Sequence, residues 1–237
     1  MNEEELRLIV SKFHIQGTVE TIKPIGNGLI NETFCVTTAG DDCPDYVLQR
    51  INNTVFTNVD LLQRNIELVT NHIRHKLLAR HEQDIDRKCL RFIHTSNGLT
   101  YHRDARNRYW RMSLFIPNAV TKEEVNNDSA FCCGQTFGNF EQMLVDLQEP
   151  LGETIPNFHN MELRLGQLRD AVKADKTGRV SLVRDMLDTL ACDADEMCLA
   201  EQLHRQGALP KRICHCDTKV NNMMFDNDGS VLCVIDL

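Results

Sequence analysis

Hydrophobic residues in the first half of the chain alternate with polar ones in short runs, and turn residues separate these runs. Strict alternation is typical of a half-buried β-strand, whereas apolar residues three or four positions apart indicate an amphipathic helix. The alternating runs cover residues 19–22, 33–37, 46–51, 89–93, 99–101 and 109–116, and helical spacing covers residues 3–13 and 60–78. The turn at Ser96-Asn97-Gly98 predicts that residues 89–93 and 99–101 pair as a hairpin. This half is therefore predicted to be a small antiparallel sheet with a packed helix.

The second half of the chain changes to helical spacing after Pro117-Asn118, which we take as a hinge. The segments with helical spacing are residues 120–147, 161–173 and 182–206. Two short apolar runs, 222–225 and 231–235, then flank Asn227-Asp228-Gly229 and predict a closing β-hairpin. The pattern thus predicts an α+β fold with an N-terminal lobe at residues 1–117 and a mainly helical C-terminal lobe at residues 118–237.

Composition narrows the class of protein. The 237 residues are 42% hydrophobic and 25% charged, which is ordinary for a globular protein. A formal net charge of -8 argues against a general nucleic-acid binder and against a binder of anionic membranes, since both usually need a basic face. No apolar run approaches the roughly 18 residues of a membrane span, and the acidic start of the chain is unlike a secretory signal.

Ten cysteines are scattered along the chain without a C-x-x-C pair. Reduced thiols in a cytoplasmic protein are the simplest interpretation. A zinc site at Cys214-His215-Cys216 is disfavoured, because on an extended segment His215 faces away from both cysteines.

One octet carries a specific chemistry. Residues 215–222 read H-x-D-x-x-x-x-N, and the hairpin that follows ends in Ile235-Asp236. Phosphoryl transfer from a nucleotide to a hydroxyl needs a carboxylate beside the acceptor and oxygen ligands for Mg²⁺. Asp217 is the candidate catalytic base, and Asn222 and Asp236 are the candidate Mg²⁺ ligands. A merely solvated Asp/Asn turn is the alternative, and the added hairpin with its Ile-Asp end argues against it.

Gly26-Asn27-Gly28 lies between two predicted strands, so it is neither a Walker A loop nor a dinucleotide fingerprint. We interpret Gly26 and Gly28 as a turn that covers nucleotide phosphates, although a plain hairpin turn has the same sequence. Kinase-like lobes also place a cation on the third strand, paired with a helix glutamate. Arg50 supplies a charge there and Glu67 is the matching helix position, but Gln49 can occupy the same register because neighbouring strand residues face opposite ways.

A polar cluster opens one of the predicted helices of the second half. His159 and Arg164 can contribute to an acceptor pocket. A helix cap at Asn157 or Asn160 with an exposed arginine explains the same residues equally well. Trp110 is most simply a core residue.

Several segments together resemble one superfamily. They are Gly-Leu-Ile-Asn at 28–31, Tyr-Val-Leu-Gln-Arg-Ile-Asn at 46–52, Asn-Ile-Glu-Leu-Val-Thr at 65–70, Tyr-Trp-Arg at 109–111, Ile-Pro-Asn-Phe-His at 155–159 and the octet at 215–222. The chain resembles the aminoglycoside phosphotransferase and choline kinase superfamily and is most similar there to N-acetylhexosamine 1-kinases.

The resemblance implies a protein-kinase-like, two-lobe fold that uses ATP and Mg²⁺. It implies Asp217 as base, Asn222 and Asp236 as metal ligands, and the segment at Phe115 and Ile116 as the adenine-binding hinge. The N-terminal lobe would bind the nucleotide. Members of the group continue well beyond the Ile-Asp motif, so the C-terminal catalytic lobe is expected to be partial and the activity of this exact chain is open.

The resulting hypothesis is a small-molecule kinase that phosphorylates the anomeric hydroxyl of an N-acetylhexosamine. The alternatives are a kinase of another small alcohol or amino alcohol, such as choline, homoserine or an aminoglycoside, and a non-catalytic remnant that binds a nucleotide. The partner is then a small-molecule acceptor, with no nucleic acid and no membrane, and the oligomeric state is open.

Overall fold

The computed structural model describes residues 2–26, 30–40 and 42–237. The chain divides into two compact units, one made of residues 1–154 and 213–237 and the other of residues 155–212. Strands and helices occur together in the first unit, and the second is helical, so the α+β class is confirmed. The predicted lobe boundary at residues 117 and 118 lies inside the first unit and stays a prediction.

A five-stranded antiparallel sheet forms the base of the first unit. Its strands are β1 (Thr18–Pro24), β2 (Glu32–Ala39), β3 (Tyr46–Ile51), β4 (His102–Arg103) and β5 (Tyr109–Leu114). They lie in the order β1-β2-β3-β5-β4, and β3 is central, with Leu48 opposite Phe34 on one side and Met112 on the other. The alternating runs at 19–22, 33–37 and 46–51 therefore form strands as predicted.

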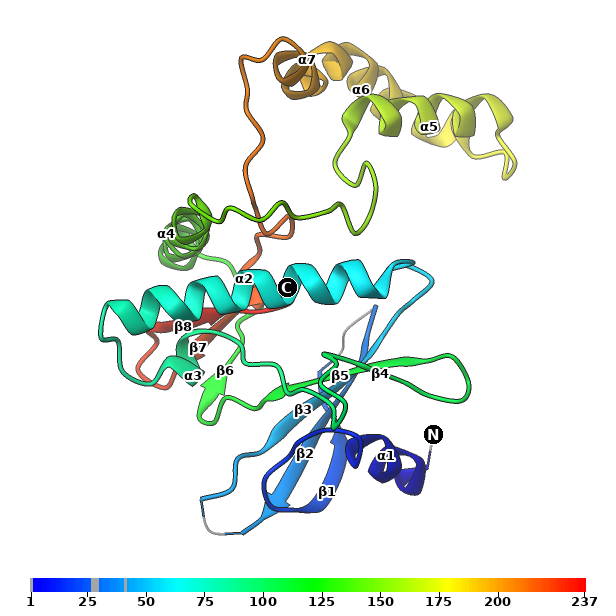
Figure 1. Cartoon of the computed structure of the whole chain (residues 1–237). Helices are drawn as coiled ribbons and strands as arrows, with labels where there is room; N and C mark the ends of the chain where they lie inside the picture. The colour runs from blue at the N-terminus through cyan, green and yellow to red at the C-terminus, as the bar shows by residue number, and fades with distance from the viewer. Residues whose placement is uncertain (1, 27–29, 41) are drawn as a thin grey trace. The chain divides into compact units, whose positions relative to one another are not determined.

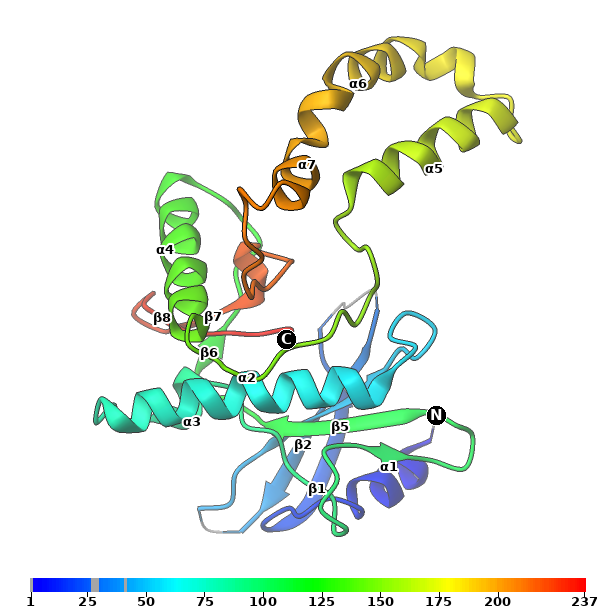
Figure 2. The ribbon, with the colours of Figure 1, turned by 45° about the horizontal axis from the view of Figure 1, so that its top comes forward.

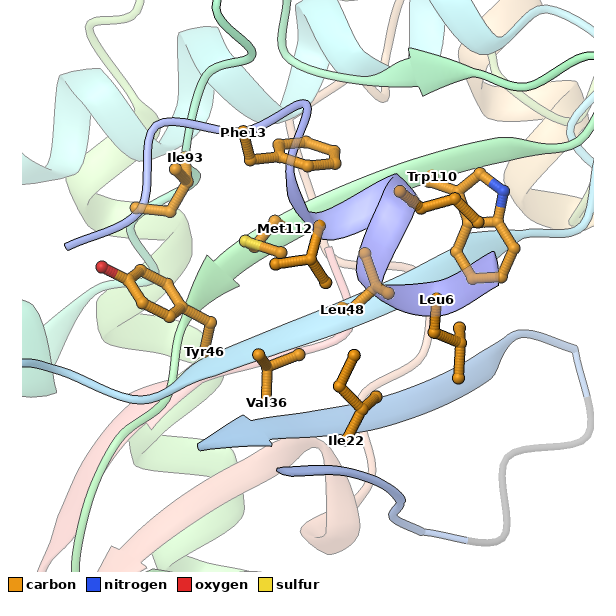
Figure 3. Packing of buried hydrophobic residues seen from close by; sticks show 11 residues of the cluster. Leu6, Phe13, Ile22, Val36, Tyr46, Leu48, Ile93, Trp110 and Met112 are labelled. Atoms are coloured by element: carbon orange, nitrogen blue, oxygen red, sulfur yellow. The ribbon is translucent and has the colours of Figure 1, made fainter. Parts of the chain in front are cut away.

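One face of this sheet packs against α1 (Glu3–Val10), whose first turn is capped by the Asn2 side chain accepting from the Glu5 N–H at 2.9 Å. Apolar side chains of α1 and of four strands meet there, as Figure 3 shows. Their burial removes apolar surface from water and stabilises the fold. Trp110 lies in this core and is fully buried, as predicted. The cluster consists of Leu6, Ile9, Val10, Phe13, Ile22, Val36, Tyr46, Leu48, Ile93, Trp110 and Met112.

The opposite face of the sheet packs against α2 (Val59–Ala79), which Figures 1 and 2 show as a long helix running across it. The Asn58 side chain caps α2 by accepting from the Leu61 N–H at 3.0 Å. Leu62 and Ile66 of the helix pack with Ile51 of β3. Both faces of β3 are thus covered, one by α1 and the other by α2.

The predicted hairpin of residues 89–93 and 99–101 is wrong. The Ile93 N–H donates to the Met112 carbonyl at 2.8 Å, and the Leu114 N–H donates to the Arg91 carbonyl at 2.9 Å. The segment therefore pairs with the second half of β5, while β4 pairs with its first half. The edge of β5 offers residues 89–93 a longer row of backbone hydrogen bonds than the three residues 99–101 do.

A second layer of the first unit includes the hairpin that follows the octet at residues 215–222. It contains α3 (Ile85–Lys88), α4 (Asn127–Leu144) and a three-stranded antiparallel sheet of β6 (Ala119–Val120), β7 (Met223–Asp226) and β8 (Val231–Val234). The predicted closing hairpin is confirmed as β7 and β8. Apolar residues of α2, α4 and this sheet share one core, including Ile73, Phe140 and Phe225.

The second unit is built from α5 (Met161–Ala174), α6 (Arg184–Met197) and α7 (Leu199–Arg205), with a 3₁₀ turn at Val180–Val183. The predicted single helix over residues 182–206 is therefore interrupted, and Cys198 separates α6 from α7. A small buried cluster of Leu165, Ala194 and Cys198 holds the unit together. No helix in the described part of the chain is long and apolar enough to cross a membrane.

Candidate active site

The loop that leads into β7 is anchored by His215. Its imidazole packs edge-on against the rings of Phe137 and Phe140 of α4, with ring centres 5.2 and 6.0 Å away. Its Nε2 donates a hydrogen bond to the Ile235 carbonyl at 2.8 Å, which ties the loop to the end of β8. His215 therefore acts on the position of the loop, since its ring is engaged by the core and by the backbone.

Asp217 and Asn222 are brought together by the turn between them. The Asn222 side chain is buried, and its Nδ2 donates both to the Asp217 carbonyl and to Asp217 Oδ2, each at 2.9 Å. Lys219 Nζ also contacts Asp217 Oδ2 at 2.7 Å. The 3₁₀ turn at Val220–Asn222 shortens the path between the two residues, so the carboxylate is held in a defined position.

The charge of Asp217 is favoured by these contacts. Partial burial raises the pKa of the carboxyl, but the hydrogen bonds from Lys219 and Asn222 and the positive charge of Lys219 outweigh it, so the pKa lies below its ordinary value. Asp217 is about half exposed and open to a ligand. An ionised, accessible carboxylate can accept a hydrogen bond from an acceptor hydroxyl.

Asp236 lies next to this pair through the backbone. The Ile235 N–H donates to the Asn222 carbonyl at 2.9 Å, so the residue before Asp236 is fixed to the metal-ligand candidate on the loop. Asp236 has a φ of 62° and Cys216, just before Asp217, has a φ of 65°. Residues other than glycine rarely adopt this left-handed backbone conformation, and strained residues of this kind cluster at functional sites.

The donor atoms fit a magnesium ion. Asn222 uses its Nδ2 for Asp217, which leaves its amide oxygen for a cation, and the Asp236 carboxylate forms no hydrogen bond within the described residues. Mg²⁺ prefers oxygen ligands and is commonly held by one or two protein groups together with phosphates. Among the described residues, no group of three His, Cys, Asp or Glu side chains could hold a metal ion without further ligands.

The structure describes part of the predicted glycine turn and separates the predicted Arg50–Glu67 pair. Gly26 has a φ of 73°, which suits glycine, whereas Gly28 lies outside the described residues. Arg50 pairs with Glu32 of β2, and Glu67 pairs with His94 at 3.0 Å, so the structure does not bring Arg50 and Glu67 together. Alternation along β3 explains this, because Arg50 shares the face of Leu48 and not the face covered by α2.

Sequence reasoning missed Arg111. This residue of β5 lies directly opposite Gln49 and is 5% exposed, with its guanidinium over the ring of Phe92 at 5.4 Å. Burial lowers the pKa of Arg111 to about 10, and the nearby Asp236 charge opposes this shift, so the group is cationic at neutral pH. The signal in the sequence is a charge in the middle of a strand whose neighbours are apolar.

The predicted hinge follows β5. Ile116 is buried, and the Phe115 N–H donates to the Asp45 carbonyl at 2.9 Å. Arg87 of α3 holds the next residues by donating to the Pro117 carbonyl at 3.3 Å, while it also forms a bidentate ion pair with Asp226 of β7. This second arginine was not singled out in the sequence, because its partners are far along the chain.

His159 and Arg164 lie in the second unit. Arg164 donates to the Phe158 carbonyl at 3.0 Å and to Gln167 at 2.9 Å, and the His159 ring packs against Phe158. The Asn160 side chain caps α5 by accepting from the Leu163 N–H at 2.9 Å. This contact supports the helix-capping interpretation of the cluster. A role of His159 and Arg164 in acceptor binding stays a prediction.

A pocket of about 610 Å³ opens beside the loop that carries Asp217. It is lined on one side by Thr218 and Lys219 and on the other by α4, where Gly134 and Gly138 leave the wall open. The pocket thus lies next to Asp217, on the loop that carries it.

Three solved structures of similar fold are described as phosphotransferases or kinases. A crystal structure of spectinomycin phosphotransferase in complex with ADP and spectinomycin is 13% identical, with a TM-score of 0.57 over 100% of this chain and 68% of that chain. An aminoglycoside phosphotransferase from Alicyclobacillus acidocaldarius is 17% identical, with a TM-score of 0.63 over 97% of this chain and 64% of that chain. Amicoumacin kinase in complex with AMP-PNP, Ca²⁺ and Ami is 11% identical, with a TM-score of 0.55 over 100% of this chain and 64% of that chain.

These likenesses confirm the kinase-like fold, and the chain spans about two thirds of the length of these proteins. The family model of the phosphotransferase enzyme family, which includes the aminoglycoside phosphotransferases, matches residues 21–237. The match runs from the first strand of the sheet through Asp217, Asn222 and Asp236. The chain therefore belongs to the phosphotransferase enzyme family.

Proposed function

We propose that the protein transfers the γ-phosphoryl group of ATP to a hydroxyl of a small molecule in the presence of Mg²⁺. The observation that carries this proposal is the geometry around Asn222, which bonds Asp217 through its side chain and the residue before Asp236 through its backbone. One short segment thereby joins the candidate base to both candidate metal ligands. Phosphoryl transfer depends chiefly on such positioning and on charge neutralisation.

Each residue has a distinct part in this proposal. Asp217 orients the acceptor hydroxyl and takes its proton as the oxygen attacks. Asn222 and Asp236 hold Mg²⁺, which neutralises phosphate charge when bound. Lys219, in contact with Asp217, keeps the carboxylate ionised and offers a cation at the mouth of the pocket.

Nucleotide binding is assigned to residues 1–117 and catalysis to residues 118–237. Gly26, Gly28, Phe115 and Ile116 are the proposed nucleotide contacts, of which the last two follow β5. The similar proteins whose structures hold ADP and AMP-PNP support a nucleotide in this role. The proposed setting is the cytoplasm, which agrees with the scattered reduced cysteines.

For the acceptor we propose the anomeric hydroxyl of an N-acetylhexosamine, with His159 and Arg164 contributing to the sugar pocket. The segments at 46–52, 155–159 and 215–222 support an amino sugar through their resemblance to N-acetylhexosamine 1-kinases. Spectinomycin and amicoumacin are named with two of the similar proteins, so antibiotic acceptors form the alternative class.

The catalytic assignment is tested with Asp217→Asn in the full chain. This change keeps the shape and removes the base, so we expect kcat to fall at least about 100-fold while Mg·ADP affinity changes little. Asp228→Asn in the β7–β8 turn makes the same charge change at an exposed site and serves as the control. Turnover of Asp217→Asn equal to that of the control would exclude Asp217 as the base.

The acceptor is tested by ADP release over a panel of N-acetylglucosamine, N-acetylgalactosamine, choline, homoserine and an aminoglycoside. We expect turnover with an N-acetylhexosamine, and a product phosphorylated at the anomeric position by NMR. Turnover only with another alcohol would support the proposed kinase reaction and overturn the N-acetylhexosamine as its acceptor. Stabilisation by Mg·ATP without turnover on any acceptor would indicate a nucleotide-binding remnant.

A further inference from the structure

β3 presents a neutral residue to α2, although a kinase-like site needs a cation near the nucleotide phosphates. Leu48 lies in the core under α1, so alternation turns Gln49 toward α2 and Arg50 away from it. Arg50 is already paired with the exposed Glu32 at the strand end. The charge on β3 therefore lies on the face opposite to α2.

The neighbouring strand supplies a charge at the same level. Arg111 of β5 is the register partner of Gln49, and its Nε donates to Gln49 Oε1 at 2.8 Å. Gln49 Nε2 in turn donates to the Thr33 hydroxyl at 3.1 Å. The amide is thus fixed at both ends, by β2 and by β5, and it orients the guanidinium plane.

The guanidinium reaches the metal-ligand segment. Arg111 Nη1 donates to the Leu237 carbonyl at 3.2 Å, immediately after Asp236, and the Asp236 charge acts on Arg111. Within the described residues Arg111 forms no ion pair with an aspartate or glutamate side chain, and its Nη2 has no hydrogen-bond partner. Burial opposes the charge of Arg111 and the charge of Asp236 supports it, so a bound anion that accepts a hydrogen bond from Nη2 favours the charged form further.

The helix that faces this charge does not neutralise it. Glu67 of α2 is engaged by His94 at the surface. Gln63 is the buried polar side chain of the same helix, and it carries no charge. A pocket of about 190 Å³ is lined by Gln63 and by Phe92, and the Arg111 guanidinium lies over the Phe92 ring. Arg111 therefore keeps its positive charge available for a ligand.

We propose that Arg111 is the cation that binds the nucleotide phosphates in this protein, with Gln49 as its positioning residue. A guanidinium can donate two parallel hydrogen bonds to a phosphate, and Nη2 is directed to no protein group that the structure describes. The cation thus lies on β5 and not on β3, and the charge of Asp236 acts on it. This inference rests on the proposed function, because it concerns the same nucleotide.

The test compares binding of Mg·ADP with binding of adenosine by calorimetry on the full chain. Arg111→Gln removes the charge, and we expect Mg·ADP to bind about 10- to 100-fold more weakly while adenosine affinity stays within about twofold. A loss confined to the phosphates separates a phosphate contact from general damage, which would weaken both ligands. Arg106→Gln makes the same substitution at an exposed site and should leave both affinities unchanged.

Two further variants keep the inference open to test if Arg111→Gln does not fold. Gln49→Leu leaves the charge but removes its anchor, and we expect roughly 10-fold weaker Mg·ADP binding with adenosine unaffected. Gln49→Lys combined with Arg111→Gln returns a cation to β3 and should recover most of the Mg·ADP affinity. Recovery would show that the charge itself is required at this level of the sheet.

Distinct results overturn the inference. Unchanged Mg·ADP affinity in Arg111→Gln would exclude Arg111 as the phosphate-binding cation. If that variant does not fold, unchanged affinity in Gln49→Leu gives the same answer. Neither result contradicts the proposed function. A selective loss in Arg50→Gln with none in Arg111→Gln assigns the role to β3 instead. Failure of the unmodified chain to bind Mg·ADP overturns both this inference and the proposed nucleotide.

Discussion

At the scale of single residues, Asp104 shows how a few atoms fix the entry to β5. Its Oδ1 accepts from the backbone N–H groups of Arg106 and Arg108 at 2.9 and 3.0 Å. Its Oδ2 accepts from Arg108 Nε at 2.6 Å and from Trp110 Nε1 at 3.0 Å. Burial raises the pKa of the carboxyl, but these bonds outweigh it and lower the pKa to about 2.

Asp104 therefore links stability to pH. Because its pKa is lower in the folded chain than in the unfolded one, its contribution is present above about pH 4 and is lost as the pH falls toward about 2. Asp104→Asn should reduce the free energy of unfolding at neutral pH by about 2 kcal/mol. Denaturant unfolding across this pH range measures the effect, with the exposed Asp188→Asn as control. A difference that does not shrink in acid would contradict this account.

At the scale of elements, α2 connects the first sheet to the layer that contains α4, β7 and β8. Leu62 and Ile66 pack on the sheet side, and Val69, Ile73 and Leu77 pack in the core shared with α4. Gln63 follows Leu62 on this helix and is 2% exposed, and neither polar atom of its amide has a partner in the described structure. A buried amide without partners opposes folding.

Gln63→Met should therefore stabilise the protein. The substitution keeps the side-chain length and removes the unsatisfied amide, so the free energy of unfolding is expected to rise by about 1–3 kcal/mol. Gln135→Met, at an exposed position of α4, controls for the gain of an apolar side chain. Thermal and denaturant unfolding give the answer, and a loss of stability in Gln63→Met would mean that the amide has a partner.

At the scale of the whole molecule, the two units differ in how much core they contain. The first has three clusters of buried apolar residues, whereas the second has Leu165, Ala194 and Cys198 with Met161 packed against them. Several large apolar side chains of the second unit are exposed, among them Leu182 and Met186. Less buried apolar surface gives less stability against local opening.

Hydrogen exchange should reflect this difference. Amides of α5, α6 and α7 are expected to exchange faster than those of α2, β3 and β5, because opening the second unit exposes less apolar surface. Peptide-level mass spectrometry on the intact chain reports each segment separately. Equal protection of α6 and α2 would show that the second unit is as stable as the first.

Local patterns in the sequence predict much of this molecule. The run at 46–51 and the periodicity at 60–78 each correspond to one element, β3 and α2, because each pattern needs only its own residues to fit a buried face. The prediction of a hairpin at residues 89–101 was wrong because residues 91–93 pair with the edge of β5, which is distant in the sequence. The octet also contains Asp217 and Asn222, whose side chains meet through a local turn, while their roles stay a prediction.

Side-chain direction was beyond the sequence where both faces of an element are covered. Gln49 and Arg50 are neighbours on a strand with α1 on one face and α2 on the other, so alternation alone does not say which points to α2. The partners of Arg111 and Arg87 lie more than a hundred residues away in the chain, at Leu237 and Asp226. Contacts of this kind depend on the assembled sheets.

The neutral centre of β3 has a consequence for chemical labelling. Nucleotide analogues that carry an acyl group react with a nearby amine, and a guanidinium is a poor nucleophile because it stays protonated. Gln49 and Arg111 offer no amine at this level of the sheet, whereas Lys219 lies beside Asp217. We therefore expect an acylating nucleotide analogue that binds at the proposed site to label Lys219 or no lysine there.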